Sequence, residues 1–90
     1  MTSNEVVKYV SKLNQMACKE LTTEAIHLSF GISSLNERKT KRLCEIDTTM
    51  DLEQIKKACK DICKTQEQIN ELNMQIVLVK NKISKKVGKE

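Results

Sequence analysis

The sequence has no proline and no tryptophan, and among its 90 residues there are only one tyrosine, one phenylalanine and two glycines. Because glycine occurs only at positions 31 and 88, nothing between these two points forces a helix to end. Large aromatic side chains usually dominate compact cores, so their scarcity argues against a conventional small globular domain. The abundant Lys, Glu, Gln, Leu and Ile are typical of long helices.

No secretory signal is visible, because Lys8 and Lys12 interrupt the few apolar residues near the N-terminus. The longest apolar run, Ile76–Val79, is far shorter than the ~20 residues that cross a membrane. These absences predict a soluble, cytoplasmic protein whose four cysteines stay reduced. A nuclear location is the alternative.

Five isoleucines recur at intervals of seven in the second half of the chain: Ile55, Ile62, Ile69, Ile76 and Ile83. Seven residues are close to two turns of α-helix, so these side chains project from one side of a single rod. Fully burying one isoleucine stabilises a protein by roughly 1.5–3 kcal/mol, so this isoleucine ladder favours a buried position. The pattern predicts an all-α, elongated coiled-coil or helical-bundle fold.

The length of this helix predicts partner chains. If residues 51–87 form one helix, it is roughly 55 Å long at ~1.5 Å per residue. A compact chain of this size has a radius of gyration of only about 12 Å, so we do not expect the remaining residues to cover the rod. We expect other helical subunits to cover part of it, in a hetero-oligomer rather than a homo-oligomer, and we expect no cofactor.

The first half of the chain carries a second amphipathic pattern. Leu21, Leu28 and Leu35 recur at intervals of seven and predict a helix that begins near residue 4. Two interpretations of the following segment stay open. Gly31 ends this helix near residue 30 and Ser34 caps the next one, or the helix passes straight through, since the apolar spacing continues across the glycine.

We therefore predict a single helical domain over residues 1–90. It has two long helices, over residues 4–30 and 35–87, with a break near Gly31–Ser34 and a short tail at 88–90. Asp47-Thr48-Thr49 is a second, weaker break point, from which the last helix would begin near Met50.

Side chains beside the ladder complete a predicted partner interface. Leu52 and Cys59 lie on one side of the ladder, and Leu72 and Val79 lie on the other. Polar residues continue the first row, and we expect them to fix register and partner choice. The whole predicted interface comprises Leu21, Leu28, Ile32, Leu35, Leu52, Ile55, Cys59, Ile62, Gln66, Ile69, Leu72, Asn73, Ile76, Val79 and Ile83.

No set of catalytic or metal-binding residues stands out. His27 is the single histidine and lacks an evident base partner, so we expect it at a surface or an interface. Cys59 and Cys63 lie one helical turn apart, but zinc needs two further ligands at workable spacing. We interpret both as small buried hydrophobic residues, with metal or redox chemistry as the alternative, and we predict that the chain is no enzyme.

Positive charge is concentrated at the C-terminus. Residues 1–79 carry eleven basic and eleven acidic side chains, so the net charge of +4 lies in the last eleven residues. Lysines there favour the helix macrodipole, and an anionic membrane or nucleic acid is the alternative explanation. A second cluster, Glu37–Arg42, fits a solvated helix face, with a nuclear address or a phosphate contact as the alternative. The candidate anion-binding residues are Arg38, Lys39, Lys41, Arg42, Lys80, Lys82, Lys85 and Lys86.

Two short stretches resemble a known family. Lys19–Thr23 (Lys-Glu-Leu-Thr-Thr) and Gln68–Asn70 (Gln-Ile-Asn) are similar to parts of subunit 2 of BLOC-1, one of the small helical subunits of the BLOC-1 and BORC complexes. The resemblance covers less than a third of the chain. It implies a cytosolic scaffold subunit, peripheral on endolysosomal membranes, that acts in organelle biogenesis or positioning. A similar general character in small kinetochore subunits leaves a chromosome or nucleic-acid adaptor as the alternative.

Overall fold

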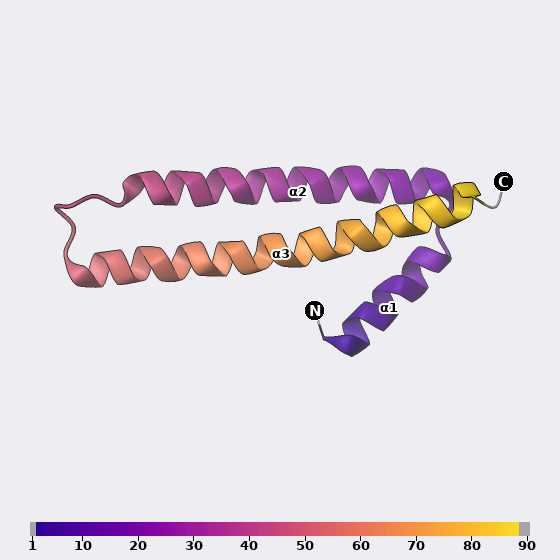
Figure 1. The fold of residues 1–90 in the computed structure, drawn as a ribbon, viewed down its shortest axis with the longest axis horizontal. Coiled ribbons are helices and arrows are strands. Elements are labelled where there is room, and N and C mark those ends of the chain that lie inside the picture. The colour runs from indigo at the N-terminus through magenta and orange to yellow at the C-terminus, as the bar shows by residue number, and fades with distance from the viewer. Residues whose placement is uncertain (1, 89–90) are drawn as a thin grey trace.

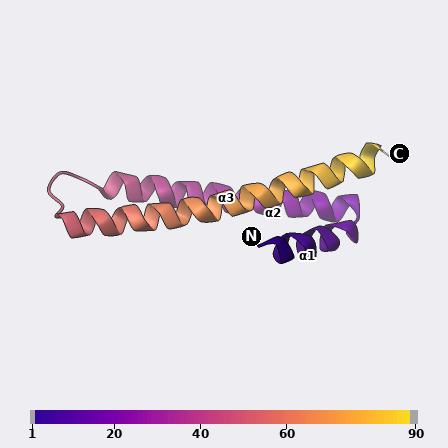
Figure 2. The same cartoon turned by 60° about the horizontal axis from the view of Figure 1, so that its bottom comes forward.

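The chain folds into three α-helices, which a computed structural model describes over residues 2–88 (Figure 1). They are α1 (Ser3–Asn14), α2 (Cys18–Glu45) and α3 (Leu52–Gly88). α2 and α3 run antiparallel as a long hairpin, and α1 turns back beside the end where α2 begins and α3 finishes (Figures 1 and 2). With extents of 59 × 24 × 15 Å, the described part is all-α and elongated, as predicted.

The turn between α2 and α3, which we call the tip, is built by short-range hydrogen bonds. Asp47 accepts hydrogen bonds from the hydroxyl (2.6 Å) and the backbone N–H (2.8 Å) of Thr49, which lower the pKa of the Asp47 carboxyl below its ordinary value. Asp51 then accepts from the N–H of Gln54 (2.8 Å), whose side chain accepts from the N–H of Asp51 (3.1 Å). This reciprocal capping box starts α3.

The predicted helix over residues 35–87 is therefore wrong at residues 46–51. The chain turns where the residues predicted only the weaker of two breaks, and α3 begins two residues after Met50. Turning here lets two amphipathic helices cover each other, which one continuous rod does not allow. Gly88 belongs to the last turn of α3, and residues 89–90 of the predicted tail lie outside the described part.

Gly31 lies inside α2 and does not end a helix. No described glycine has a positive φ, so the interpretation of a straight passage is correct and a break at Gly31–Ser34 is wrong. The glycine instead permits a close approach, because a Cβ atom at this position would lie 3.1 Å from Cδ1 of Leu72 on α3.

The helix predicted over residues 4–30 is interrupted at residues 15–17, so its boundaries were also wrong. No glycine or proline marks this break. Backbone N–H groups of Gln15 and Met16 bond back to carbonyls of Lys12 and Leu13 and close the last turn of α1. Tertiary packing explains the bend, because it folds α1 back and leaves Leu13 only 1% exposed.

The core lies at the end of the hairpin opposite the tip, which we call the base. Leu13 of α1, Leu21 and Leu28 of α2, and Ile76 and Val79 of α3 form one buried cluster. Leu21 and Val79 are 0% exposed, and each such side chain stabilises the fold by roughly 1.5–3 kcal/mol. Three helices therefore meet at the base, whereas only α2 and α3 continue to the tip.

Candidate interaction surfaces

The isoleucine ladder faces α2 within the same chain. Ile69 and Ile76 are buried, and the other three isoleucines are half-buried. Each helix contributes two rows of residues at intervals of seven, none of them exposed, and we call these four rows the seam. The seam comprises Cys18, Ala25, Ile32, Lys39 and Ile46; Leu21, Leu28, Leu35 and Arg42; Ile55, Ile62, Ile69, Ile76 and Ile83; and Ala58, Thr65, Leu72, Val79 and Lys86.

We expected that the remaining residues would not cover the long helix, and the seam shows that this expectation was wrong. α2 covers the seam of α3 along most of its length, so the ladder packs within the chain itself, with Ile69 and Ile76 buried. In the first half of α3, Ala58 and Thr65 are buried, whereas Leu52 is 65% exposed and Cys59 is exposed. The seam holds the hairpin together, so the predicted partner interface is not formed by the seam residues.

Polar side chains enter the seam near the tip. Lys39 Nζ donates to Gln66 Oε1 (2.8 Å), and Arg42 donates to Glu45 Oε2 (2.7 Å) and Asp61 Oδ2 (3.1 Å). The hydrogen bond with Glu45, helped by the negative charges of Glu45 and Asp61, raises the pKa of Arg42 above its ordinary value. The contacts of Lys39 with Gln66 and of Arg42 with Asp61 cross the hairpin and fix one register between α2 and α3. The Glu37–Arg42 cluster is therefore not simply a solvated face.

The two polar residues expected to fix register differ in their surroundings. Gln66 is half-buried, accepts from Lys39, and donates to Asn70 Oδ1 (2.8 Å). Asn73 is exposed. Gln66 thus has a partner within the chain, and Asn73 is left for any role at an outer surface.

One side of the hairpin, which we call the α1 flank, is the side on which α1 packs. Tyr9 of α1 donates to Glu24 Oε1 of α2 (3.3 Å). This flank is defined by the residues of α2 at intervals of seven from Glu24 and by the row of α3 that lies beside the seam on the same side of the hairpin. They are Glu24, Gly31, Arg38 and Glu45 on α2, and Asp61, Gln68, Gln75 and Lys82 on α3.

The opposite side, which we call the open flank, carries no helix of the described chain. It is defined by the row on the other side of the seam in each helix. Its residues are Thr22, Ser29, Asn36 and Leu43 on α2, and Leu52, Cys59, Gln66, Asn73, Lys80 and Val87 on α3. All except Gln66 are exposed.

The two flanks differ sharply in charge. Five of the eight residues of the α1 flank are charged, but only one of the ten on the open flank, Lys80. Exposed apolar side chains gather on the open flank, where Leu43 is 49% and Leu52 65% exposed. Ile26 and Val77, on the next rows outward from the open flank, are about half exposed as well. The open flank thus carries almost no charge and combines uncharged polar side chains with exposed apolar ones.

The cysteines do not form the small buried pair that we expected. Cys59 and Cys63 are exposed, as is Cys44, while Cys18 is half-buried in the seam. All four are free thiols. Within residues 2–88, no group of three or more His, Cys, Asp or Glu side chains is placed to hold a metal ion.

The C-terminal lysines occupy different environments. Lys80 and Lys85 are exposed, whereas Lys82 and Lys86 are half-buried. Lys86 Nζ donates to the backbone carbonyl of Met16, which ties the end of α3 to the linker between α1 and α2. Lys89 lies outside the described residues. Lys86 thus has a structural role at the base.

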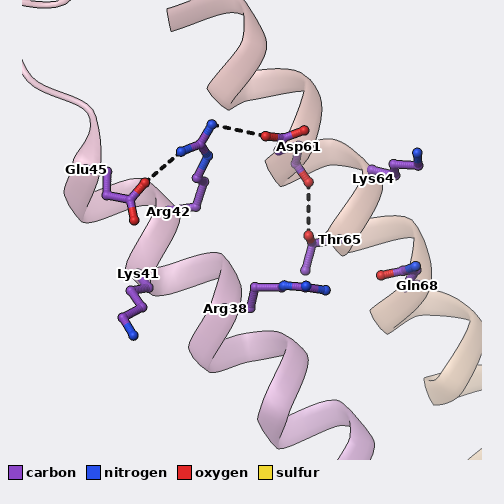
Figure 3. A pocket seen from close by; sticks show the side chains of 8 residues that line it. All are labelled: Arg38, Lys41, Arg42, Glu45, Asp61, Lys64, Thr65 and Gln68. Atoms are coloured by element: carbon purple, nitrogen blue, oxygen red, sulfur yellow. Dashed lines mark hydrogen bonds and ion pairs between the residues drawn. The ribbon is translucent and has the colours of Figure 1, made fainter. Parts of the chain in front are cut away.

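A cleft of about 510 Å³ opens between α2 and α3 on the α1 flank near the tip (Figure 3). Arg42 lies between Glu45 and Asp61, while Lys41 and Lys64 stand at opposite edges of the cleft (Figure 3). The cleft is lined by Arg38, Lys41, Arg42, Glu45, Asp61, Lys64, Thr65 and Gln68.

The sequence indicated the basic side chains of α2 in this cleft, but it did not indicate Asp61 and Lys64 of α3. Asp61 and Lys64 lie in a different part of the sequence from Arg42, and no spacing rule within one helix connects them. The antiparallel register between α2 and α3, which brings Asp61 to Arg42, was the missing information.

Comparison with protein-family models, curated proteins and solved structures gives no match to this chain. The resemblance to BLOC-1 and BORC subunits therefore stays a prediction from two short stretches. Across residues 2–88, no helix combines the length and the apolar content that crossing a bilayer requires.

Proposed function

We propose that the chain is a non-enzymatic structural subunit that assembles with other helices through the open flank. The observation that supports this proposal is the near absence of charge on that flank, together with exposed Leu43 and Leu52. Charged residues are depleted in the cores of protein interfaces, and apolar side chains exposed as a group favour burial. The α1 flank, rich in charge, has the opposite character.

The size of the open flank is sufficient for a stable complex. α2 is roughly 40 Å long at ~1.5 Å per residue, and two helices packed ~10 Å apart present a face about 20 Å wide. The resulting area of roughly 800 Å² is about what one partner contributes to a standard interface. The partner surface has to be equally free of charge, because an unpaired charge buried against this flank would be costly. Other helical subunits, in a hetero-oligomer, meet this requirement.

The cellular setting is proposed from the resemblance alone. Lys19–Thr23 begins near the start of α2 and Gln68–Asn70 lies in the middle of α3, and both resemble small subunits of BLOC-1 and BORC. We propose a cytoplasmic scaffold that associates with endolysosomal membranes through its partners. The alternative, a chromosome or nucleic-acid adaptor, has fewer free cations than the sequence suggested, because Lys39 and Arg42 are bonded within the hairpin.

A charge placed on the open flank tests the proposal. We expect Leu43→Glu to abolish co-purification of partner chains from the cells that make the protein, because the new carboxylate has no counter-charge in an apolar contact. Phe30→Glu, at an exposed apolar position of α2 that lies on neither flank, introduces the same negative charge and serves as the matched control. Quantitative mass spectrometry of the purified complexes measures the effect, and circular dichroism confirms that both variants keep their helices.

Identical sets of partner chains at equal yield with both variants would show that the open flank is not the assembly surface. Imaging of the tagged chain addresses the proposed location separately. A distribution on chromosomes, without endolysosomal membranes, would support the adaptor instead.

A further inference from the structure

The cleft between α2 and α3 carries positive charge that the chain itself does not neutralise. Four cationic side chains line it, Arg38, Lys41, Arg42 and Lys64, against two carboxylates. Both carboxylates are already bonded to Arg42. Within residues 2–88, Arg38, Lys41 and Lys64 have no hydrogen bond or ion pair, and Nε of Arg42 is buried without an acceptor. The cleft therefore offers three free cations and one donor that lacks a partner.

The same side of the hairpin already seats a helix nearer the base. Glu24, which receives the hydrogen bond from Tyr9 of α1, precedes Arg38 by two heptads on one row of α2. On α3, Gln75 and Lys82 are half-buried on the row where α1 packs, whereas Gln68 on the same row is exposed. α1 thus covers this flank near the base and leaves it uncovered at the cationic cleft.

We propose that this uncovered cleft binds an acidic amphipathic helix of a partner protein. Arg38 extends from α2 toward α3, while Lys41 and Lys64 stand at opposite edges of the cleft (Figure 3). A helix with carboxylates on both sides of its contact face meets Lys41 and Lys64 at once, as the charged flanks of packed helices commonly do.

This site is independent of the open flank and can be tested with the purified chain. The probe is a synthetic amphipathic helix of three heptads with leucine and isoleucine in its contact face and glutamate on both sides. We expect it to bind, and a matched probe with lysine in place of glutamate not to bind. Lys41→Glu combined with Lys64→Glu should weaken binding of the acidic probe by about tenfold at low salt, because two attractions become repulsions.

The matched control is Lys80→Glu combined with Lys85→Glu, two exposed residues at the other end of α3 from the cleft, with the same change in net charge. It should change affinity by less than about twofold. Titration calorimetry measures affinity, and backbone amide NMR shifts should map the probe to Thr65 and Gln68 rather than to Asn73 on the open flank.

Three outcomes would overturn the proposal. An acidic probe that does not bind, or one that loses equal affinity in both double variants, shows that no defined acidic-helix site exists. Tighter binding of a single-stranded oligonucleotide, with the same dependence on Lys41 and Lys64, assigns the cleft to nucleic acid instead. Since none of these variants touches Leu43, failure here leaves the proposed function of the open flank standing.

Discussion

Replacing Gly31 by alanine sets two opposed effects against each other at a single methyl group. In the middle of a helix, alanine is favoured over glycine by about 1 kcal/mol. The new Cβ would lie 3.1 Å from Cδ1 of Leu72, which is too close for an ordinary contact. Leu72 is half-buried and its methyl group is the far end of a flexible side chain, so a shift of a few tenths of an ångström is feasible. Such a rotation costs roughly 0.5 kcal/mol.

We therefore expect Gly31→Ala to raise the free energy of unfolding by about 0.5 kcal/mol, which for a chain of this size is a rise in Tm of roughly 2–4 °C. Urea and thermal denaturation followed by circular dichroism measure this change. Protein concentration is held fixed, because self-association shifts the apparent stability. Ser33→Ala, at an exposed position of the same helix, reports the helix-propensity effect without the Leu72 contact.

A loss of more than about 1 kcal/mol in Gly31→Ala would refute this reasoning. Combining it with Leu72→Ala then identifies the error. If the second substitution removes the penalty of the first, Leu72 is held more rigidly than we infer. If the penalty remains, the backbone at Gly31 needs a conformation that alanine resists, and α2 does not pass straight through this residue.

Two further predictions concern the base. Leu21→Ala removes a fully buried side chain and should lower the free energy of unfolding by about 2–5 kcal/mol. The control Leu43→Ala, at a half-exposed position, should lower it by less than about 1 kcal/mol. Chemical denaturation measures both values, and equal losses would contradict the position of the core. Burial, with a smaller contribution from Glu24, raises the pKa of Tyr9 from 10.0 to about 12. Because the folded chain holds this proton more tightly than the unfolded chain, the packing of α1 should be fully stable below pH 10 and should weaken as the pH rises toward 12. Absorbance of tyrosinate reports this single tyrosine. Glu24→Gln should lower the titration midpoint of Tyr9, whereas Glu20→Gln should leave it unchanged. A midpoint near 10 in the chain without substitutions would contradict the burial of Tyr9 and its hydrogen bond to Glu24.

The long-range pattern of this sequence predicted the fold class well. The isoleucine ladder and the row from Leu21 to Leu35 both face the seam, because seven-residue spacing fixes one face of a helix whatever packs against it. Spacing does not reveal whether the covering helix belongs to the same chain. That choice depends on the tip, where Asp47 and Asp51 form local hydrogen bonds that a heptad pattern does not show.

The candidate surfaces were harder to predict from the sequence than the fold class. The break after Asn14 has no glycine or proline and arises from packing at the base. The contrast between the flanks and the pairing of Arg42 with Asp61 depend on the register of two antiparallel helices, which neither helix specifies alone. Cys59, expected to be buried, is exposed because the buried row of α3 lies on the other side of the ladder, at Ala58 and Thr65.

Apolar residues fill the seam at the base, whereas polar residues enter it near the tip. We therefore expect α2 and α3 to separate more easily at the tip than at the base. At the base, Leu21 and Val79 are sealed by a third helix and by the link from Lys86 to Met16, so separation there exposes the whole core. Near the tip, separation breaks the Lys39–Gln66 and Arg42–Asp61 contacts, whose groups water readily solvates. We therefore expect local unfolding to start at the tip and to stop short of the base, so that α2 and α3 separate at one end while the rest of the chain stays folded.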